Sequence, residues 1–117
     1  MLIKKYGRTQ TFDDSEFMSK EDIEKVKEDF AKAAIRTKKA GFDGVEIHAA
    51  HEYLLTHFYS PYTNKRSDEY GGNLENRLRL ANEIIQEVRA SVGEDYIVAI
   101  RFGAYDYLEG GSKLEEI

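Results

Sequence analysis

Two histidines and a tyrosine lie close together in the stretch GVEIHAAHEYLL, residues 44–55. His48 and His51 are three residues apart, Tyr53 is two residues further on, and the whole sequence has only three histidines. Imidazole and phenol groups can all donate hydrogen bonds. Three donors that converge on one point suit a carbonyl oxygen that gains negative charge during a reaction, and the tyrosine can also deliver a proton. The cluster therefore favours carbonyl activation.

Two other interpretations of these histidines stay open. Glu46, His48 and His51 offer a carboxylate and two imidazoles, which a metal hydrolase could use as ligands. Their spacing differs from the helical His-Glu-x-x-His arrangement, but Glu46 and His48 should share one strand face. Alternatively, one histidine is a hydrogen-bonded core residue. We expect His57 to be only a surface or packing residue.

Arg101 is unusual because it lies within the apolar segment YIVAIRF, residues 96–102. A guanidinium keeps its charge, so inside a sheet it needs an anionic or carbonyl-rich partner. That partner is either Glu46 on a neighbouring strand or a cofactor that develops negative charge. The charged loop NKRSDEYGGNLENR, residues 64–77, is expected to form loop-fixing ion pairs and a helix cap.

The segment from residue 19 to residue 41 carries the signals of a capped helix. Ser19 can cap the first turn, Asp22 occupies the reciprocal capping-box position, and Gly41 is a natural stop. Apolar residues at helical spacing predict one buried stripe. They are Ile23, Val26, Phe30, Ala33 and Ala34.

A second helix is predicted to begin near Asn73 and to end at Gly93. Its expected apolar stripe consists of Leu74, Leu78, Ala81, Ile84, Ile85 and Val88. Short apolar runs at 43–48 and 96–102 predict buried strands. One or two helical turns are expected between residues 50 and 58, and residues 1–18 should form an irregular lead-in.

The order helix, strand, loop, helix, strand indicates an α/β fold with parallel strands covered by helices. Functional groups in such folds gather at the C-terminal ends of the strands. His48 ends the first predicted strand, and Arg101 lies near the end of the second. We therefore expect a single domain over residues 1–117 whose chemistry lies at this end of the sheet.

The composition indicates a soluble globular protein. The 117 residues are 41% hydrophobic and 33% charged, with a formal net charge of −5 and no cysteine. Without a basic stripe, nucleic acid is not an expected partner. No segment has the character of a signal peptide or of a membrane span, so we expect a cytoplasmic protein with no membrane partner.

Residues 40–102, and above all the histidine pair with its tyrosine together with SDEYGGNLENR, resemble the Old Yellow Enzyme family of FMN-dependent oxidoreductases. The resemblance implies a (β/α)₈ TIM barrel with FMN at its C-terminal mouth. It implies that His48 and His51 hold the substrate carbonyl and that His48 also lies against the flavin. By the same resemblance, Tyr53 is the proton donor and Arg101 lies at the pyrimidine edge of the flavin. The implied reaction uses NAD(P)H as electron donor and reduces activated C=C bonds of α,β-unsaturated carbonyl compounds.

The chain departs from the family pattern in two respects. Glu52 stands where family members usually have glycine. A complete barrel needs roughly 250 residues, so we expect a partial TIM barrel, about strand 4 to strand 5 with flanking helices. As an isolated chain, such a fragment should bind FMN poorly or not at all, and it could form a homo-oligomer through its exposed sheet edges. The alternative is a non-catalytic barrel remnant or assembly module.

Overall fold

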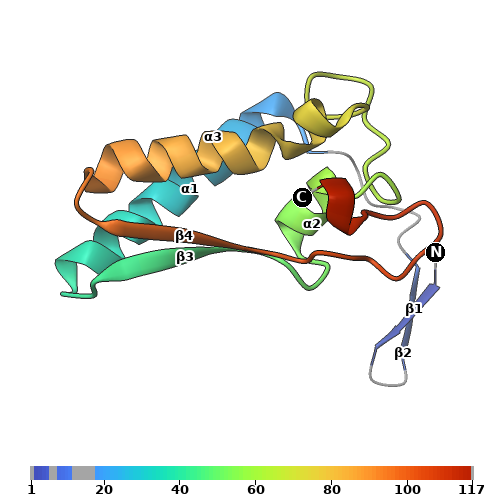
Figure 1. The fold of residues 1–117 in the computed structure, drawn as a ribbon, viewed down its shortest axis with the longest axis horizontal. Coiled ribbons are helices and arrows are strands. Elements are labelled where there is room, and N and C mark those ends of the chain that lie inside the picture. Colours follow the sequence, from blue (N-terminus) through green and yellow to red (C-terminus); the bar gives the residue numbers. More distant parts are fainter. Residues whose placement is uncertain (1, 6–7, 12–17, 117) are drawn as a thin grey trace.

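The main elements occur in the predicted order from the first helix onward (Figure 1). The computed structural model describes residues 2–5, 8–11 and 18–116. Its elements are β1 (Leu2–Lys5), β2 (Arg8–Thr11), α1 (Lys20–Lys39), β3 (Gly44–Ala49), α2 (Leu54–Tyr59), α3 (Leu74–Val92), β4 (Ile97–Phe102) and the 3₁₀ helix η1 (Leu114–Glu116).

Strands β3 and β4 form a parallel pair that runs in register from Gly44 opposite Ile97 to Ala49 opposite Phe102. Helices α1 and α3 lie together on one face of this pair (Figure 1). Ile47 and Ala49 point toward the helices and are buried. The predicted α/β arrangement with parallel strands is therefore confirmed.

The other face of the β3–β4 pair is not covered by any described residue. Side chains alternate between the two faces of a strand, and those on this side are exposed. We call this side the open face; it carries Glu46, His48, Ile97, Ala99 and Arg101. The expectation that both strands are buried is thus wrong for this face, because short apolar runs do not reveal how many layers cover a sheet.

The ends of α1 follow the predicted signals. The Ser19 hydroxyl accepts a hydrogen bond from the Asp22 backbone N–H at 3.1 Å, and Asp22 Oδ2 accepts one from the Ser19 N–H at 3.0 Å. This reciprocal pair satisfies two amides that the first turn of a helix leaves free. After α1, Gly41 adopts a φ of 88°, which favours glycine and ends the helix.

The buried stripe of α1 differs in part from the predicted one. Ala33 is exposed, whereas Ala31, which the prediction omitted, is buried. Lys27 is also buried, with its Nζ 2.6 Å from Glu24 Oε1 and 3.1 Å from Glu83 Oε2. Burial disfavours the charged amine, but the hydrogen bonds with these two carboxylates outweigh it and raise the pKa of Lys27.

Helix α3 begins and ends where the sequence predicts. The Asn73 side chain accepts a hydrogen bond from the Asn76 N–H at 2.9 Å, and Gly93 ends the helix with a φ of 86°. Of the predicted stripe, Ala81, Ile84 and Val88 are buried. The buried face also includes residues that the prediction omitted, namely Arg77, Leu80 and Val92.

Part of the predicted irregular lead-in is a β-hairpin. β1 pairs with β2 in antiparallel register, from Leu2 opposite Thr11 to Lys5 opposite Arg8. Each strand has only four residues, which is too short for alternation to stand out in the sequence. Of the remaining lead-in, the structure describes Met18, and residues 1, 6–7 and 12–17 lie outside the described residues.

None of the described helices combines the length and apolarity needed to cross a membrane.

Candidate active site at the ends of strands β3 and β4

His48 lies near the C-terminal end of β3 and belongs to the open face. Its register partner on β4 is Arg101. Because paired residues of neighbouring strands project from the same side of a sheet, the imidazole and the guanidinium rise from adjacent positions. The predicted placement of both residues at this end of the sheet is confirmed.

The chain reverses sharply after β3. His51 and Glu52 both have a φ of 58°, in the left-handed region, and the Tyr53 N–H donates to the Ala50 carbonyl at 3.4 Å. Residues other than glycine pay on the order of 1–2 kcal/mol for this conformation. Two such residues in succession, next to candidate functional groups, are a common mark of an active site. Glycine at position 52 would adopt this turn without strain, whereas the glutamate does not.

This turn brings the three predicted donors together. The ring centroids of His48 and His51 are 5.5 Å apart, and those of His48 and Tyr53 are 5.2 Å apart. All three side chains are exposed, and Tyr53 retains 57% of its accessible surface. The phenol and both imidazoles can therefore reach a molecule that lies over the end of β3.

Arg101 is paired with Glu46 across the open face. Its Nε lies 2.7 Å from Glu46 Oε2, and Nη2 lies 3.4 Å from Oε1. The hydrogen bond from Arg101 lowers the pKa of the Glu46 carboxyl. Both side chains are at least half exposed, so the pair contributes little to stability. The ion-pair interpretation of Arg101 is thus realised, while its remaining N–H donors have no partner among the described residues.

The described residues contain no group of three or more His, Cys, Asp or Glu side chains placed to hold a metal ion. Glu46, which would have completed such a set with His48 and His51, is directed to Arg101.

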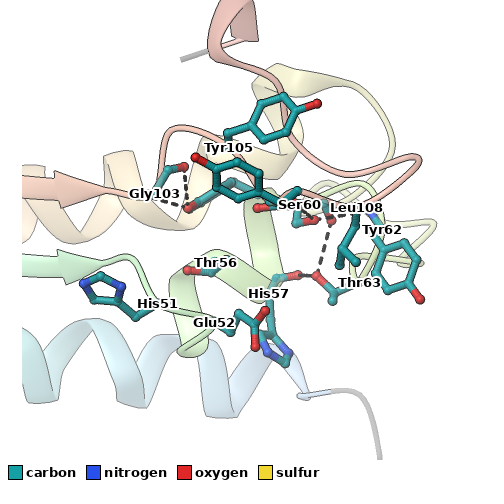
Figure 2. A pocket seen from close by; sticks show the side chains of 13 residues that line it. His51, Glu52, Thr56, His57, Ser60, Tyr62, Thr63, Gly103, Tyr105 and Leu108 are labelled. Atoms are coloured by element: carbon teal, nitrogen blue, oxygen red, sulfur yellow. Dashed lines mark hydrogen bonds between the residues drawn. The ribbon is translucent and has the colours of Figure 1, made fainter. Parts of the chain in front are cut away.

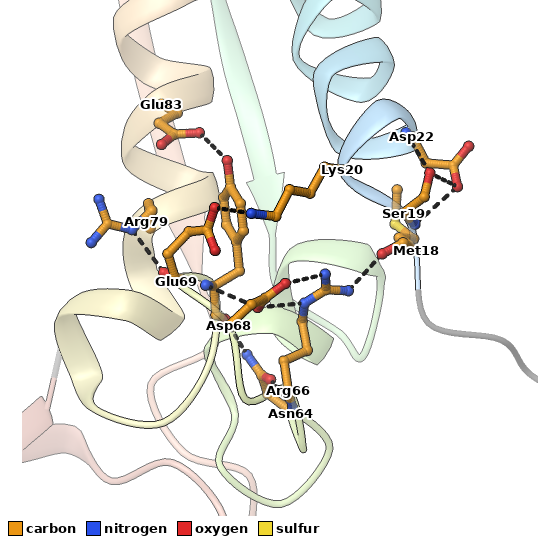
Figure 3. Close-up of polar contacts among 11 residues, drawn as sticks. Met18, Ser19, Lys20, Asp22, Asn64, Arg66, Asp68, Glu69, Arg79 and Glu83 are labelled. Atoms are coloured by element: carbon orange, nitrogen blue, oxygen red, sulfur yellow. Dashed lines mark hydrogen bonds and ion pairs between the residues drawn. The ribbon is translucent and has the colours of Figure 1, made fainter.

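The loop between α2 and α3 is fixed by the ion pairs and caps predicted for it (Figure 3). Arg66 donates from Nε and Nη2 to the two oxygens of Asp68 at 3.0 and 2.6 Å, and from Nη1 to the Met18 carbonyl at 2.7 Å. These hydrogen bonds from Arg66 lower the pKa of Asp68. The Asn64 amide donates to the Tyr70 carbonyl at 2.7 Å and also to the Phe58 carbonyl. The loop is thereby tied both to α2 and to the start of α1.

Arg77 is a structural residue that the sequence did not identify. It is 7% exposed, and it donates to the Tyr59 carbonyl and to the Gly72 carbonyl, both at 2.8 Å. Because Tyr59 is the last residue of α2, Arg77 anchors the helix that follows the left-handed turn at His51 and Glu52, which we call the site turn.

A cavity of about 440 Å³ is lined by His51, one of the three donors (Figure 2). The site turn, α2 and the segment that follows β4 form its walls. His57 lines it, so this residue is exposed as predicted but also faces the cavity. Tyr105 and Asp106 also line it and were not singled out from the sequence. Their position just after the C-terminal end of β4 was the signal that could have indicated them.

Two contacts hold the segment after β4 against α2. The Tyr59 hydroxyl donates to the Gly103 carbonyl at 3.1 Å and accepts from the Gly103 N–H at 3.2 Å. The Ser60 hydroxyl donates to Asp106 Oδ2 at 2.5 Å. These contacts keep the two chain segments that border the cavity at a fixed separation.

Comparison with known proteins agrees with this geometry. Residues 4–117 match the sequence model of the NADH:flavin oxidoreductase / NADH oxidase family. The chain belongs to this family. The resemblance to the Old Yellow Enzyme family is thereby confirmed, and members of the family use FMN with NAD(P)H.

Individual family members are similar over most of this chain. The NADH oxidase of Thermoanaerobacter brockii is 50% identical over 95 residues, which are 81% of this chain and 15% of that protein. The Old Yellow Enzyme from Pichia sp. AKU4542 superposes with a TM-score of 0.76 at 44% identity, covering 86% of this chain and 26% of that one. The Old Yellow Enzyme homologue from Zymomonas mobilis gives a TM-score of 0.79 at 35% identity, covering 99% and 32%. The chain therefore spans less than a third of each of these relatives.

Proposed function

We propose that this chain supplies the carbonyl-activating part of an FMN-dependent, NAD(P)H-using oxidoreductase that reduces activated C=C bonds of α,β-unsaturated carbonyl compounds. The observation that carries the proposal is the convergence of His51 and Tyr53 on His48, with ring centroids 5.5 and 5.2 Å from that of His48. Arg101 lies beside His48 on the next strand. Family membership supports the flavin chemistry, and the donor cluster supports the substrate class.

The two histidines have the role of holding the substrate carbonyl. Each imidazole can donate an N–H to the oxygen, and donors fixed in place before the reaction stabilise the charge that develops there. His48 is held by the β3 ladder, and His51 by the left-handed turn, so neither position depends on the substrate. Hydrogen bonds to the oxygen withdraw electron density from the alkene and make its β-carbon electrophilic.

Tyr53 has the role of proton donor. Its ring lies 5.2 Å from that of His48, and its hydroxyl group is exposed at the start of α2. A phenol is a suitable general acid when it lies within hydrogen-bond reach of the atom that takes the proton. Here that atom is the α-carbon, which is adjacent to the carbonyl carbon.

The C-terminal end of the open face offers two side chains to a planar cofactor at the barrel mouth. Arg101 and His48 stand next to each other on it, and Glu46 engages only part of the arginine's fork of five N–H donors. We assign Arg101 to the pyrimidine edge of FMN and His48 to a second contact. When bound, FMN supplies hydride chemistry, with electrons from NAD(P)H passing to the β-carbon of the alkene. The guanidinium charge of Arg101 favours the anionic form of a reduced ring.

We further infer that β3 and β4 are about the fourth and fifth strands of a (β/α)₈ barrel. The parallel pairing, the helices on one face and the polar residues at the C-terminal ends support this assignment. In a barrel the open face would point to the interior, where the neighbouring strands complete the layer.

A second candidate is a non-catalytic barrel remnant or assembly module, favoured by the uncovered strand surface. Ile97 is 62% exposed on the open face, and within the described chain each of the two strands has only one neighbour. Such edges can pair with a second copy of the chain. This candidate predicts self-association without flavin binding.

A flavin titration separates the two candidates. Because a chain that spans less than a third of its relatives should bind FMN weakly, the titration extends to high protein concentration. The proposal predicts that the visible spectrum of FMN shifts there, and that NAD(P)H is oxidised when an enone is present. Tyr53→Phe should retain the spectral shift and lose alkene reduction, because it removes only the proton donor. Protein that sediments as a dimer and leaves the FMN spectrum unchanged would instead indicate the remnant.

A further inference from the structure

The cavity beside the donors has one largely apolar wall. Tyr105 and Tyr107 follow β4, and their rings meet edge to face with centroids 4.9 Å apart. Leu108 continues the same wall. Rings in this arrangement offer both faces and edges to an aromatic or alkyl group. The volume of about 440 Å³ is in the range of small-molecule binding sites.

The cavity carries two carboxylates and no permanent cation. Glu52 and Asp106 line it together with the imidazoles of His51 and His57, and none of the described residues that line it is a lysine or an arginine. Asp106 Oδ2 already accepts hydrogen bonds from the Ser60 hydroxyl at 2.5 Å and from the Ser112 N–H at 2.7 Å. Glu52, labelled in Figure 2, is an exposed residue of the cavity lining, so its carboxylate is available to a molecule that enters.

One buried polar group of the cavity lining has no partner among the described residues. Thr56 is 6% exposed, and its buried hydroxyl makes no hydrogen bond to another described residue. Leaving a buried hydroxyl unpaired is costly, so native structures usually satisfy it with protein, water or ligand. An uncharged polar substituent in the cavity could provide this partner.

We propose that the cavity receives the part of the substrate that lies beyond the reacting carbonyl, and that Glu52 is a specificity-determining residue that excludes anionic substituents there. This inference rests on the proposed function, because it places the carbonyl at His48 and His51. An aromatic or alkyl group packs on the tyrosines, while a carboxylate or phosphate would lose water and meet Glu52 without a compensating cation. Like charges at such a site are repelled more strongly than in bulk water.

Two probes that differ only in the charge of their distal group test this inference. They are the para-carboxamide and the para-carboxylate of benzylideneacetone, whose enone ends are identical. Dissociation constants are measured by NMR titration of the 117-residue chain without flavin, with both probes in the same buffer. We expect the resonances of Thr56 and Tyr105 to shift, and the carboxamide to bind about tenfold more tightly.

Two matched variants test whether Glu52 causes the preference for the carboxamide over the carboxylate. Glu52→Gln should reduce the preference to less than about threefold by tightening carboxylate binding. Glu94→Gln removes the same charge at the opposite end of the strands, between α3 and β4, and should leave the preference unchanged. Equal affinity for the two probes in the unmodified chain, or a preference that survives Glu52→Gln, would overturn the inference.

Because the two probes are titrated without flavin, the test of charge selectivity does not depend on FMN binding. If neither probe shifts the cavity resonances, the cavity does not receive this part of the substrate and the inference is wrong. If the probes bind as expected but FMN does not, the proposed flavin chemistry fails while the charge selectivity stands.

Discussion

Arg101 and Glu46 form an ion pair across two parallel strands, with Nε and Oε2 2.7 Å apart on the face that lacks a covering layer. Arg101 is thus held next to His48 by a partner from the same strand as His48. The ion pair fixes the position of the Arg101 guanidinium in the site. The pKa of the Glu46 carboxyl reports whether this ion pair is formed.

The Glu46 carboxyl should titrate below its usual pKa of 4.5, because the hydrogen bond from Arg101 stabilises the carboxylate. A pH titration followed by carboxyl ¹³C NMR measures this pKa. In Arg101→Gln the pKa should return toward the ordinary value, whereas Arg79→Gln, which removes a guanidinium from α3, should leave it low. An unchanged Glu46 pKa in Arg101→Gln would contradict the pairing.

The same shift determines the direction of a pH effect on stability. The folded-state pKa of Glu46 is lowered, so the ion pair adds to the free energy of unfolding above the ordinary carboxyl pKa. That contribution is lost as the pH falls through the lowered value. Because both side chains are exposed, the effect should be small, and added salt should reduce it further.

Replacing Glu52 by glycine should stabilise the chain. Its φ of 58° is strained for glutamate and free of strain for glycine. The gain is reduced by the greater flexibility of glycine in the unfolded state, so we expect a net increase of about 0.5–1 kcal/mol in the free energy of unfolding. Urea denaturation measures it. Glu52→Ala removes the same carboxylate but keeps a β-carbon, so stabilisation by alanine as large as that by glycine would argue against backbone strain.

Removing the cap of α1 should destabilise the protein. Ser19→Ala deletes the hydroxyl that accepts from the Asp22 N–H, at an expected cost of about 1 kcal/mol. For a chain of this size that corresponds to a fall of roughly 4–8 °C in Tm, measured by circular dichroism. Ser91→Ala, inside α3, is the matched control. It should be neutral or slightly stabilising, because alanine has the higher helix propensity.

Two isoleucines should respond differently to the loss of one methylene group. Ile84 on α3 is fully buried, so Ile84→Val should cost about 0.5–1.5 kcal/mol. Ile97 on the open face is 62% exposed, so Ile97→Val should change the free energy of unfolding by less than about 0.5 kcal/mol. Chemical denaturation of both variants compares them. A large loss at Ile97 would show that a second copy of the chain covers the open face.

The parts of the structure that depend on neighbouring residues in the sequence were predictable. Ser19 with Asp22, Asn73, and the glycines at 41 and 93 delimit the two long helices through contacts spanning a few residues. His48 and Arg101 could be placed together because parallel strands end at the same edge. The contact of Tyr53 with His48 followed from their short separation in the chain.

Features that depend on distant segments were not predictable. The Ser60–Asp106 contact joins residues 46 positions apart, so the cavity that it borders leaves no local pattern. Lys27 is buried because Glu83 approaches it from another helix, and nothing within α1 indicates that partner. The strained turn was hidden for a different reason, since glutamate is not a residue type that suggests a left-handed backbone.

The alternation of side chains along β3 and β4 divides their residues by parity. In β3 the even-numbered Glu46 and His48 meet the site, while the odd-numbered Ile47 and Ala49 support the helices. In β4 the parity is reversed, with Arg101 outward and Ile100 and Phe102 toward the helices. Substitutions can therefore alter ligand contacts and helix packing separately within one strand. Deleting a single residue upstream of His48 within β3 would exchange the two faces of the strand. The His48 imidazole would then point toward the helices, and an aliphatic side chain would point toward the ligand.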